Sequence, residues 1–416
     1  MKILMIDKYY FIKGGAERYL FELSRIMEAH NHRIIPFSMK HPRNVYTPYE
    51  DFFVDHMDYD LPSIWIKAVK SPVVFSRMIY SLQARNRLDK LINKTKPDIA
   101  HLHMIDHQLS PSILHVLKKY GIPVIQTVHQ YKMVCPNYRL YNMRTHKICE
   151  KCLDGHYYHP IFERCHKNSS TAGLMLAMET VVHKAMKIYE NCINLFHVPS
   201  RFMGIKLQEN GIDGGKIEHL FYTIELNEYK LSFDSDNYFI YYGRLSNEKG
   251  ILTLLKAMRN VKTSQLFIVG DGPQKEELES FAFKHQLRNV RFVGLKGGEE
   301  LKSLVAHSKF VVVPSEWYDN SPLVIYESFA LGKPVIGSAL GGIPELVEHE
   351  NTGLLFRAGD SDMLTEAIQF LLHHPGFIKD YGFNARMKAE KQFNPRFHYR
   401  EMIKKYRKLL GRISEN

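Results

Sequence analysis

The chain has 416 residues, of which 45% are hydrophobic and 24% are charged. One hydrophobic core rarely organises so long a chain, so the length predicts two domains of roughly 200 residues each. No apolar run approaches the roughly 18 residues that a membrane-spanning helix needs. The apolar run Lys2–Ile6 is too short for the core of a signal peptide and is typical of a first strand, so the expected compartment is the cytoplasm.

The formal net charge of +12 and the isoelectric point of about 9.2 indicate an anionic partner. Such a partner is a nucleic acid, a membrane surface or a phosphorylated small molecule. The sequence contains no helix-turn-helix pattern, no aromatic RNA-binding signature and no dense basic tail. Nucleic acid is therefore the least favoured of the three.

The N-terminal half alternates predicted strands and helices. A strand over Met1–Asp7, a turn with Gly14 and Gly15, and a helix from about Ala16 to Met27 are typical of the opening unit of a Rossmann-like domain. Further elements are expected as strands over 98–103, 123–129, 193–198 and 216–221 and helices over 110–120, 172–192 and 201–210. His129 stands at the end of one of these strands, which is where open α/β sheets bind their ligands.

Residues 63–94 combine apolar side chains, including Trp65 and Phe75, with many basic ones. This pattern fits a helical region on an anionic membrane, where each basic residue near the surface contributes roughly 1 kcal/mol. A helix packed on the core with a solvated basic face explains it equally well.

Four of the five cysteines, Cys135, Cys149, Cys152 and Cys165, lie in the segment 130–168. The Cys-x2-Cys pair with one cysteine on either side could supply four thiolates to a structural zinc ion. Reduced, loosely ordered thiols are the alternative, and nearby histidines could replace any of the four. A catalytic zinc is less favoured, because four thiolates leave no open coordination position.

The polar residues 225–237 are predicted to link a domain over 1–224 to a second domain over 238–394. After a strand over Tyr238–Tyr242, the loop Gly243-Arg244-Leu245-Ser246-Asn247-Glu248-Lys249-Gly250 leads into a helix. The Arg244 guanidinium can bind phosphate oxygens in a bidentate manner, and Lys249 adds a compact charge.

Two further strand ends carry loops of interest. The strand Leu266–Val269 ends in Gly270-Asp271-Gly272-Pro273, whose glycines leave room for a nucleotide base or ribose, although an ordinary turn explains them nearly as well. After the apolar strand Phe310–Val313, a helix is predicted to open at Ser321 as N-cap, with Pro322 in its first turn. The N–H groups at such a helix start can bind an anion such as phosphate.

The stretch EWYDNSPLVIYESFALGKPVIGSALGGIPE, from Glu316 to Glu345, resembles the donor-site signature of retaining glycosyltransferases of the GT-B architecture, specifically family 4 (glycosyl transferases group 1). In that family seven residues separate two glutamates. Here Glu327 is the second acid, and Asp319, one methylene shorter, stands at the first position. Asn320, Pro322 and the Gly332–Ile336 strand entry also match the family. The resemblance spans essentially the whole chain, most strongly over 238–350 and most weakly over 40–95.

The resemblance implies an α/β fold with two Rossmann-like domains that face each other across a donor and acceptor cleft. It also implies that a last helix, in residues 395–416, packs back on the first domain. Arg244 and Lys249 would clamp the donor diphosphate, and His129 would contact the sugar or the reacting centre.

Among the acids, Asp319 would contact the donor sugar and Glu327 the ribose hydroxyls. The Gly14-Gly15 loop would approach the donor phosphate or the acceptor. The other donor-binding positions that the resemblance implies are Gly270, Asp271, Asn320, Ser321, Pro322 and Leu323.

The sequence therefore predicts a retaining, metal-independent glycosyltransferase that uses a nucleotide diphosphate sugar and a glycan or lipid-linked acceptor. Its expected role is cell-surface polysaccharide synthesis, with peripheral contact at the inner face of the membrane. No cofactor is expected for catalysis, because two side-chain cations replace a divalent ion. A catalytically silent sugar-nucleotide or glycan-binding subunit is the alternative, with Asp319 as its only hint. A Rossmann oxidoreductase is set aside, because the chain lacks a Gly-x-Gly-x-x-Gly turn.

Overall fold

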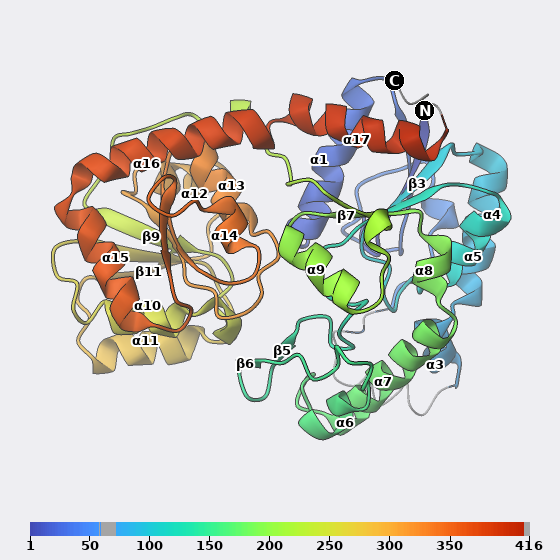
Figure 1. The fold of residues 1–416 in the computed structure, drawn as a ribbon, viewed down its shortest axis with the longest axis horizontal. Helices are drawn as coiled ribbons and strands as arrows, with labels where there is room; N and C mark the ends of the chain where they lie inside the picture. The colour runs from blue at the N-terminus through green and yellow to red at the C-terminus, as the bar shows by residue number, and fades with distance from the viewer. Residues whose placement is uncertain (58, 60–71, 412–416) are drawn as a thin grey trace. The chain divides into compact units, whose positions relative to one another are not determined.

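The computed structural model describes residues 1–57, 59 and 72–411 (Figure 1). It divides into two compact units. Unit 1 comprises residues 1–145, 149–221 and 398–416, and unit 2 comprises residues 146–148 and 222–397. Trp65 and the surrounding part of the predicted membrane segment lie outside the described residues.

Unit 1 is built on a parallel sheet of six strands in the order β2-β1-β3-β4-β7-β8. These strands are β1 Lys2–Ile6, β2 Arg33–Phe37, β3 Ile99–Leu102, β4 Val124–Thr127, β7 Leu195–Val198 and β8 Ile217–His219. Every residue of β3, β4 and β7 is buried, as expected for a parallel sheet that helices cover on both faces.

The helices of this unit are α1 Gly15–Ala29, α3 Pro72–Ile79, α4 Leu82–Thr95, α5 Ser112–Lys119, α6 His159–Glu163, α7 Ser170–Ala185, α8 Ile188–Cys192, α9 Arg201–Glu209 and α17 Pro395–Leu409, whose first residues belong to unit 2. The short elements are η1 Glu50–Phe52, η2 Gly214–Lys216, β5 Tyr141–Asn142 and β6 Lys147–Ile148.

The single helix predicted over 172–192 is wrong. Helices α7 and α8 are separate, because Lys187 takes a left-handed φ of 44° that an α-helix cannot continue through. The last helix, α17, lies on α1, where the Tyr19 hydroxyl is 2.9 Å from Nε2 of His398.

The described part of the predicted membrane segment fits the alternative of a core-packed helix. Leu88, Leu91 and Ile92 of α4 are buried. On the outer side of the helix, the Arg87 guanidinium donates to the backbone oxygen of Asp51 at 2.7 Å. Among the described residues, no helix is both long enough and apolar enough to cross a membrane.

Unit 2 repeats the arrangement with a parallel sheet in the order β11-β10-β9-β12-β13-β14. The strands are β9 Tyr238–Tyr242, β10 Gln265–Val269, β11 Val290–Gly294, β12 Val311–Val313, β13 Val335–Ser338 and β14 Gly353–Phe356. The other elements are η3 Leu226–Glu228, η4 Asn247–Lys249, α10 Ile251–Ala257, α11 Lys275–Lys284, α12 Gly298–Ala306, α13 Leu323–Ala330, α14 Ile343–Leu346, α15 Ser361–His373, α16 Pro375–Lys388 and the π-helical segment η5 Ala389–Phe393. The predicted α/β class with two Rossmann-like domains is confirmed.

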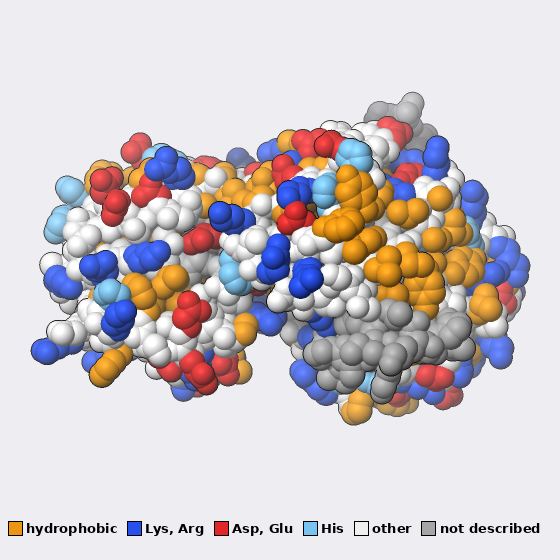
Figure 2. All heavy atoms as spheres, turned by 90° about the horizontal axis from the view of Figure 1, so that it is seen from below, with side chains coloured by type: hydrophobic (Ala, Val, Ile, Leu, Met, Phe, Trp, Pro, Cys, Tyr) orange, Lys and Arg blue, Asp and Glu red, His pale blue; other side chains and the backbone are white. Residues whose placement is uncertain are grey.

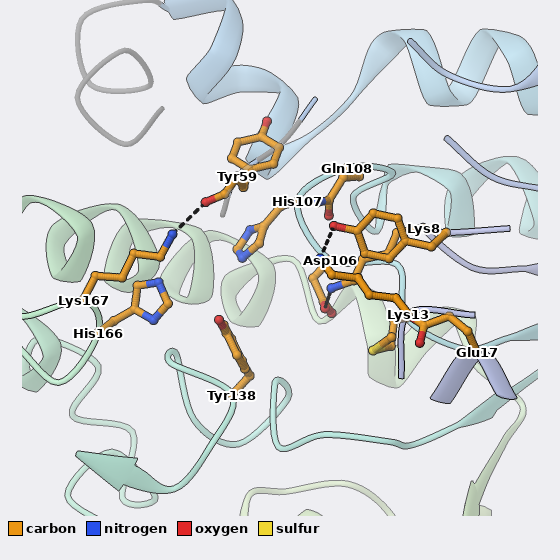
Figure 3. A pocket seen from close by; sticks show the side chains of 12 residues that line it. Lys8, Lys13, Glu17, Tyr59, Asp106, His107, Gln108, Tyr138, His166 and Lys167 are labelled. Atoms are coloured by element: carbon orange, nitrogen blue, oxygen red, sulfur yellow. Dashed lines mark hydrogen bonds and ion pairs between the residues drawn. The ribbon is translucent and has the colours of Figure 1, made fainter. Parts of the chain in front are cut away.

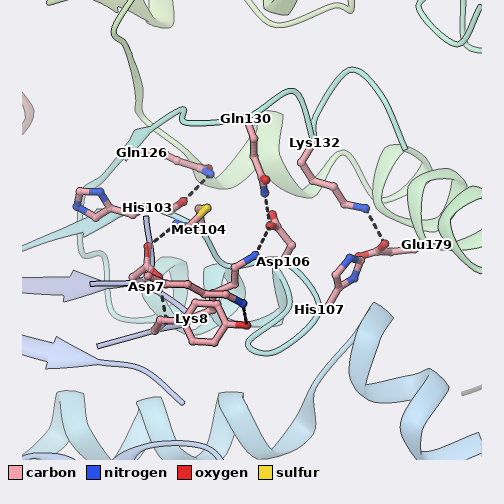
Figure 4. Close-up of polar contacts among 12 residues, drawn as sticks. Asp7, Lys8, His103, Met104, Asp106, His107, Gln126, Gln130, Lys132 and Glu179 are labelled. Carbon is pink, nitrogen blue, oxygen red and sulfur yellow. Dashed lines mark hydrogen bonds and ion pairs between the residues drawn. The ribbon is translucent and has the colours of Figure 1, made fainter. Parts of the chain in front are cut away.

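A buried ion pair fastens α7 to the loops that follow β3 and β4 (Figure 4). Glu179 of α7 is 1% exposed and accepts from Nζ of Lys132 at 2.7 Å, while Nδ1 of His107 lies 3.3 Å from its other oxygen. Burial alone would raise the pKa of Glu179, but His107 and Lys132 outweigh it and hold that pKa below its usual range. This contribution to stability is therefore present at neutral pH and is lost as the pH falls.

We expect Lys132→Met to lower the free energy of unfolding by about 3 to 5 kcal/mol, because it leaves the buried Glu179 carboxylate without its cation. Urea unfolding at pH 7 measures this loss. Lys119→Met, which removes an exposed lysine 2.9 Å from Asp89, is the matched control and should change stability little. Equal stability of the two variants would contradict a structural role for the buried pair.

Candidate functional site

The strand order of unit 2 reverses at β9. The next strand along the chain, β10, lies on one side of β9, and β12 lies on the other. Ligands of open α/β sheets bind beyond the carboxyl ends of the strands at such a reversal. The loops that leave β9 and β12 here are 243–250 and 314–322, the two segments that the sequence singled out most strongly.

The structure joins these two loops through Lys249 and Asp319. Nζ of Lys249 lies 2.5 Å from Oδ2 of Asp319 and 5.3 Å from the ring centre of Trp317. The Ser315 hydroxyl donates to the same carboxylate oxygen at 3.1 Å. Asp319 is only 7% exposed, so this ion pair holds a cation in a defined place at the edge of the sheet.

Glycines allow the two loops to come this close. Gly250 has a φ of 67°, and a Cβ there would lie 1.9 Å from the backbone oxygen of Pro314. Gly270, with a φ of 144°, would place a Cβ 1.9 Å from the backbone oxygen of Gly243. Both positions require glycine, and the resulting main-chain contacts fix the loop that carries Lys249. Gly270 therefore has a packing role that the sequence did not reveal.

The Arg244 side chain and several buried polar atoms at this edge have no hydrogen-bond partner among the described residues. Arg244 is exposed, and its guanidinium makes no hydrogen bond or ion pair with the described residues. Three buried polar atoms nearby lack hydrogen-bond partners within the described part of the chain: Ser246 Oγ, Gln274 Oε1 and Trp317 Nε1. Buried polar groups are seldom left unpaired, so such a gathering marks a place that a ligand can complete. Asp271 is exposed and accepts from the Gly272 N–H at 2.8 Å.

The predicted start of the helix after β12 is wrong by one residue. Helix α13 begins at Leu323, and Pro322, with an extended ψ of 119°, is its N-cap residue. Ser321 therefore stands too early to cap the helix, and its hydroxyl instead lies 2.7 Å from the Tyr326 hydroxyl. The N-cap residue of α13 therefore provides no side-chain cap to the first N–H groups of the helix. Asn320, two residues before this N-cap, is buried.

Glu327 lies one turn inside α13, beside the Tyr242 hydroxyl. Burial first, and the Glu327 charge second, raise the pKa of Tyr242. The Tyr242 hydroxyl donates to the backbone oxygen of Val324 at 2.8 Å. This tyrosine at the end of β9 therefore contacts the helix that carries Glu327, which ties both elements to the same edge.

Unit 1 has a polar cavity at the carboxyl edge of its own sheet, where the strand order reverses at β1 (Figure 3). Its volume is about 160 Å³. The residues that line it come from the loops after β1 and β3, from α1 and from the segments after β2 and β4: Lys8, Tyr9, Lys13, Glu17, Tyr59, Met104, Asp106, His107, Gln108, Tyr138, His166 and Lys167. Lys8 pairs with Asp106 at 3.3 Å, and Oε1 of Gln108 is buried without a hydrogen-bond partner among the described residues. The mixture of cations, carboxylates and aromatic rings suits a hydroxyl-bearing ligand.

The predicted glycines of the first loop lie at the start of α1. Gly14 is its N-cap, and the Gly14 N–H donates to Oε2 of Glu17 at 2.9 Å. This N–H is therefore already engaged. The φ of Gly14, −163°, is extended backbone that any residue adopts, so its conformation does not explain the glycine. Gly15 begins the helix and is exposed.

His129 follows β4, and its Nε2 lies 2.9 Å from Nδ1 of His103, which follows the neighbouring strand β3. Burial lowers the pKa of His129 to about 3, so the ring is neutral at pH 7. His103 is not among the site residues predicted from the sequence. Its signal was the His-x-His spacing of His101 and His103 at the end of a buried strand.

Comparison with known proteins identifies the family. Residues 13–221, half of the chain, match the family described as Glycosyltransferase Family 4, and residues 224–388 match Glycosyl transferases group 1. The chain belongs to glycosyltransferase family 4. The resemblance stated from the sequence is thereby confirmed, and the protein is a glycosyltransferase.

Related proteins and solved structures agree with this assignment. An uncharacterized glycosyltransferase of Methanocaldococcus jannaschii is 23% identical over 79% of this chain and 80% of its own length. The amylovoran biosynthesis glycosyltransferase AmsK of Erwinia amylovora is 29% identical over 38% of this chain and 42% of its own.

Two solved structures share the architecture. The sucrose-phosphate synthase of Thermosynechococcus elongatus superimposes with a TM-score of 0.71 at 20% identity, covering 99% of both chains. The Anabaena protein HepE, solved in complex with UDP-glucose, gives a TM-score of 0.65 at 18% identity over 97% of this chain and 99% of that one. The fold of this chain is GT-B.

The four cysteines of segment 130–168 lie near one another, and Cys135, Cys152 and Cys165 are buried. Burial first, and the neighbouring thiols second, raise the pKa of Cys152; burial and Cys135 raise that of Cys165 to about 12. All four are free thiols, and among the described residues no three His, Cys, Asp or Glu side chains have the arrangement that a metal ion needs. The donor set is chemically suitable, but its placement does not form a zinc site, so zinc stays a prediction.

That prediction is one zinc ion per chain, because four thiolates satisfy a tetrahedral ion completely. Elemental analysis of protein purified without chelator should then find zinc in a one-to-one ratio, and neither the four ligands nor the buried Cys192 should react rapidly with a thiol reagent. Addition of a chelator should make the other four reactive, since the metal holds them as ligands. Metal-free protein with five titratable thiols would refute zinc binding.

Proposed function

We propose that this glycosyltransferase transfers a sugar from a nucleotide diphosphate donor with retention of anomeric configuration, and that the donor binds at the strand reversal of unit 2. The observation that carries the proposal is the convergence of Lys249, Asp319 and the exposed Arg244 at this edge, beside the start of α13. Two cations and the uncapped N–H groups of a helix suit a diphosphate. The HepE structure with UDP-glucose supports a sugar nucleotide as donor.

In this mechanism the protein acts mainly on the leaving group. The departing nucleotide diphosphate gains negative charge in the transition state, so fixed cations near its oxygens lower the barrier more than they stabilise bound substrate. Arg244 is available for this contact, and Lys249 is already held at the edge by Asp319. Glu327 would accept hydrogen bonds from the ribose, and Asp319 would contact the sugar. Side chains supply the positive charge in this step, so it needs no metal ion, and no covalent intermediate is assigned.

We place the acceptor in the polar cavity of unit 1. Its lysines, carboxylates and tyrosines can bind the hydroxyls and any charged substituent of a glycan or a lipid-linked glycan. The similarity to an amylovoran biosynthesis glycosyltransferase supports a role in cell-surface polysaccharide synthesis. The contact predicted between His129 and the transferred sugar remains part of this proposal.

We further propose that the protein makes peripheral contact with an anionic membrane through α6 and α7. The outward face of α7 exposes Leu174, Met178 and Val181 to between 41% and 52%, and Phe162 of α6 is 72% exposed. Figure 2 looks onto the side of the molecule on which α6 and α7 lie in Figure 1, and it shows hydrophobic side chains gathered on this face. Apolar side chains of this kind can insert shallowly, while the net charge of +12 attracts anionic lipid.

Loss of either of the two basic side chains proposed to bind the donor diphosphate should reduce turnover strongly without unfolding the protein. We expect Arg244→Ala or Lys249→Ala to lower kcat by about 10²- to 10³-fold, because each removes a preorganised charge at the leaving group. The donor is chosen first by thermal shift with UDP-, GDP- and ADP-sugars, since a ligand of the native state raises Tm. Arg288→Ala, at an exposed arginine of the same unit, is the control. Normal turnover in either site variant would contradict the assignment, and donor binding without any transfer or hydrolysis would favour a silent binding subunit.

Membrane contact should depend on the apolar stripe of α7. We expect the wild-type protein to co-sediment with anionic vesicles and the Leu174→Ser, Met178→Ser, Val181→Ser triple variant to bind them weakly, because serine removes the inserted apolar area. Binding should fall with salt, since the Debye length shortens from about 10 Å at 0.1 M to about 3 Å at 1 M. Phe283→Ser, at an 88% exposed position of α11, is the control. Equal binding to neutral and anionic vesicles, or an unaffected triple variant, would contradict this location.

A further inference from the structure

Three side chains from adjacent strands of unit 1 form a line that ends at His129. Met5 belongs to β1, His103 follows β3 and His129 follows β4, and these strands are neighbours in the sheet. Nε2 of His103 lies 3.2 Å from Sδ of Met5, and Nδ1 of His103 lies 2.9 Å from Nε2 of His129. Each nitrogen of the His103 ring therefore has one partner.

The two imidazole rings lie edge to edge. Their planes differ by 16° and their centroids are 5.2 Å apart. Two rings stacked face to face could not bring nitrogen atoms within 2.9 Å, so the rings must lie nearly in one plane, with an N–H of one directed at a lone pair of the other. The Tyr19 ring packs against both, with centroids 5.9 Å from His103 and 5.8 Å from His129. This packing restricts rotation of either ring.

The thioether determines which nitrogen of His103 carries the proton. Burial lowers the pKa values of both histidines far enough that each ring is neutral, with one N–H donor and one acceptor nitrogen. A methionine sulfur can accept a hydrogen bond but has no proton to donate. The contact with Met5 therefore requires the proton of His103 on Nε2. Nδ1 of His103 is then an acceptor, and it receives the Nε2–H of His129.

We propose that His103, held in one tautomer by Met5, is a positioning residue that fixes His129 as its Nε2–H tautomer, so that His129 meets a sugar hydroxyl through an unprotonated Nδ1. The assigned tautomers follow from the contacts within unit 1. Only the sugar contact rests on the proposed function. A hydroxyl hydrogen-bonded to this nitrogen must act as donor, which restricts how the sugar can lie.

A purely structural role for His103 predicts a different response to substitution. If His103 only filled the core, Met5→Leu, which keeps the apolar volume, would leave both rings as they are. If the sulfur selects the tautomer, the same change removes the acceptor that faces Nε2 of His103 and distinguishes the two ring nitrogens. In His103→Gln the amide supplies both an acceptor and a donor, so the hydrogen bond from His129 should be preserved. In His103→Leu the side chain has no acceptor, so this hydrogen bond is lost.

The experiment is two-bond ¹H–¹⁵N NMR of the whole protein with ¹⁵N-labelled histidine, without substrate, at pH 7. The expected wild-type spectrum shows His103 and His129 as Nε2–H tautomers. In Met5→Leu, the signals of both rings should shift toward a mixture of tautomers. Met175→Leu, at another buried methionine of unit 1, should leave them unchanged. An Nδ1–H tautomer of His129 in the wild type, or unchanged rings in Met5→Leu, would overturn the proposal.

Donor turnover then tests whether the fixed tautomer matters. We expect kcat/KM to fall about tenfold in Met5→Leu and further in His103→Leu, the size of effect that loss of one ordinary hydrogen bond gives, and to recover in His103→Gln. Normal turnover in a Met5→Leu protein with mixed tautomers would overturn the positioning role. If the wild-type protein transfers no sugar, the proposed function fails, and with it the sugar contact, while the spectra still decide the tautomers.

Discussion

The carboxyl edge of a parallel sheet is the constraint on which the rest of this molecule depends. Parallel strands all end on the same side, so every loop that leaves them reaches the same edge, and a reversal of strand order separates two of those loops. Unit 2 reverses at β9 and unit 1 at β1. The cations and acids of unit 2 and the cavity of unit 1 lie at these edges, where the loops leave backbone and side chains open to a ligand.

Burial has an equally general effect on the histidines of unit 1. His101 lies 2.6 Å from the hydroxyls of both Tyr406 and Thr127, and Thr127 in turn lies 2.8 Å from Nδ1 of His197. This network joins α17 to β3, β4 and β7. Burial lowers the pKa of His101 and of His398 to about 3, so the rings act as neutral hydrogen-bonding groups. The unfolded chain takes up protons on them below a pH of about 6.5, and stability therefore falls as the pH drops through that window.

Sequence patterns predicted the elements and the edge they share, because strand length, apolar periodicity and glycine turns are local signals. They could not supply contacts between distant segments. The pairing of Lys249 with Asp319 joins two loops 70 residues apart, and the need for glycine at 250 arises from the backbone of Pro314.

The two wrong predictions, the cap at Ser321 and the single helix over 172–192, have the same origin. Ser321 was placed as a cap because its hydroxyl suits one, but that hydroxyl binds Tyr326, and the break between α7 and α8 at Lys187 has no glycine or proline to announce it.

The ion pair at the reversal also explains how an aspartate can serve where the family has glutamate. A lysine left alone at a partly covered edge would lose hydration without gaining a partner, and such burial disfavours the charged form. With 24% of its side chain exposed, the Lys249 ammonium lies beside Asp319 and over the ring of Trp317. The shorter acid is held there by Ser315, so its oxygen reaches the ammonium without extending further. The diphosphate of the proposed donor carries more charge than one carboxylate, so it would draw Lys249 away from Asp319 and leave that acid to accept from a sugar hydroxyl. In the proposed mechanism one pair would then serve two purposes in sequence: it positions the Lys249 ammonium before the donor arrives, and its acid would contact the sugar afterwards.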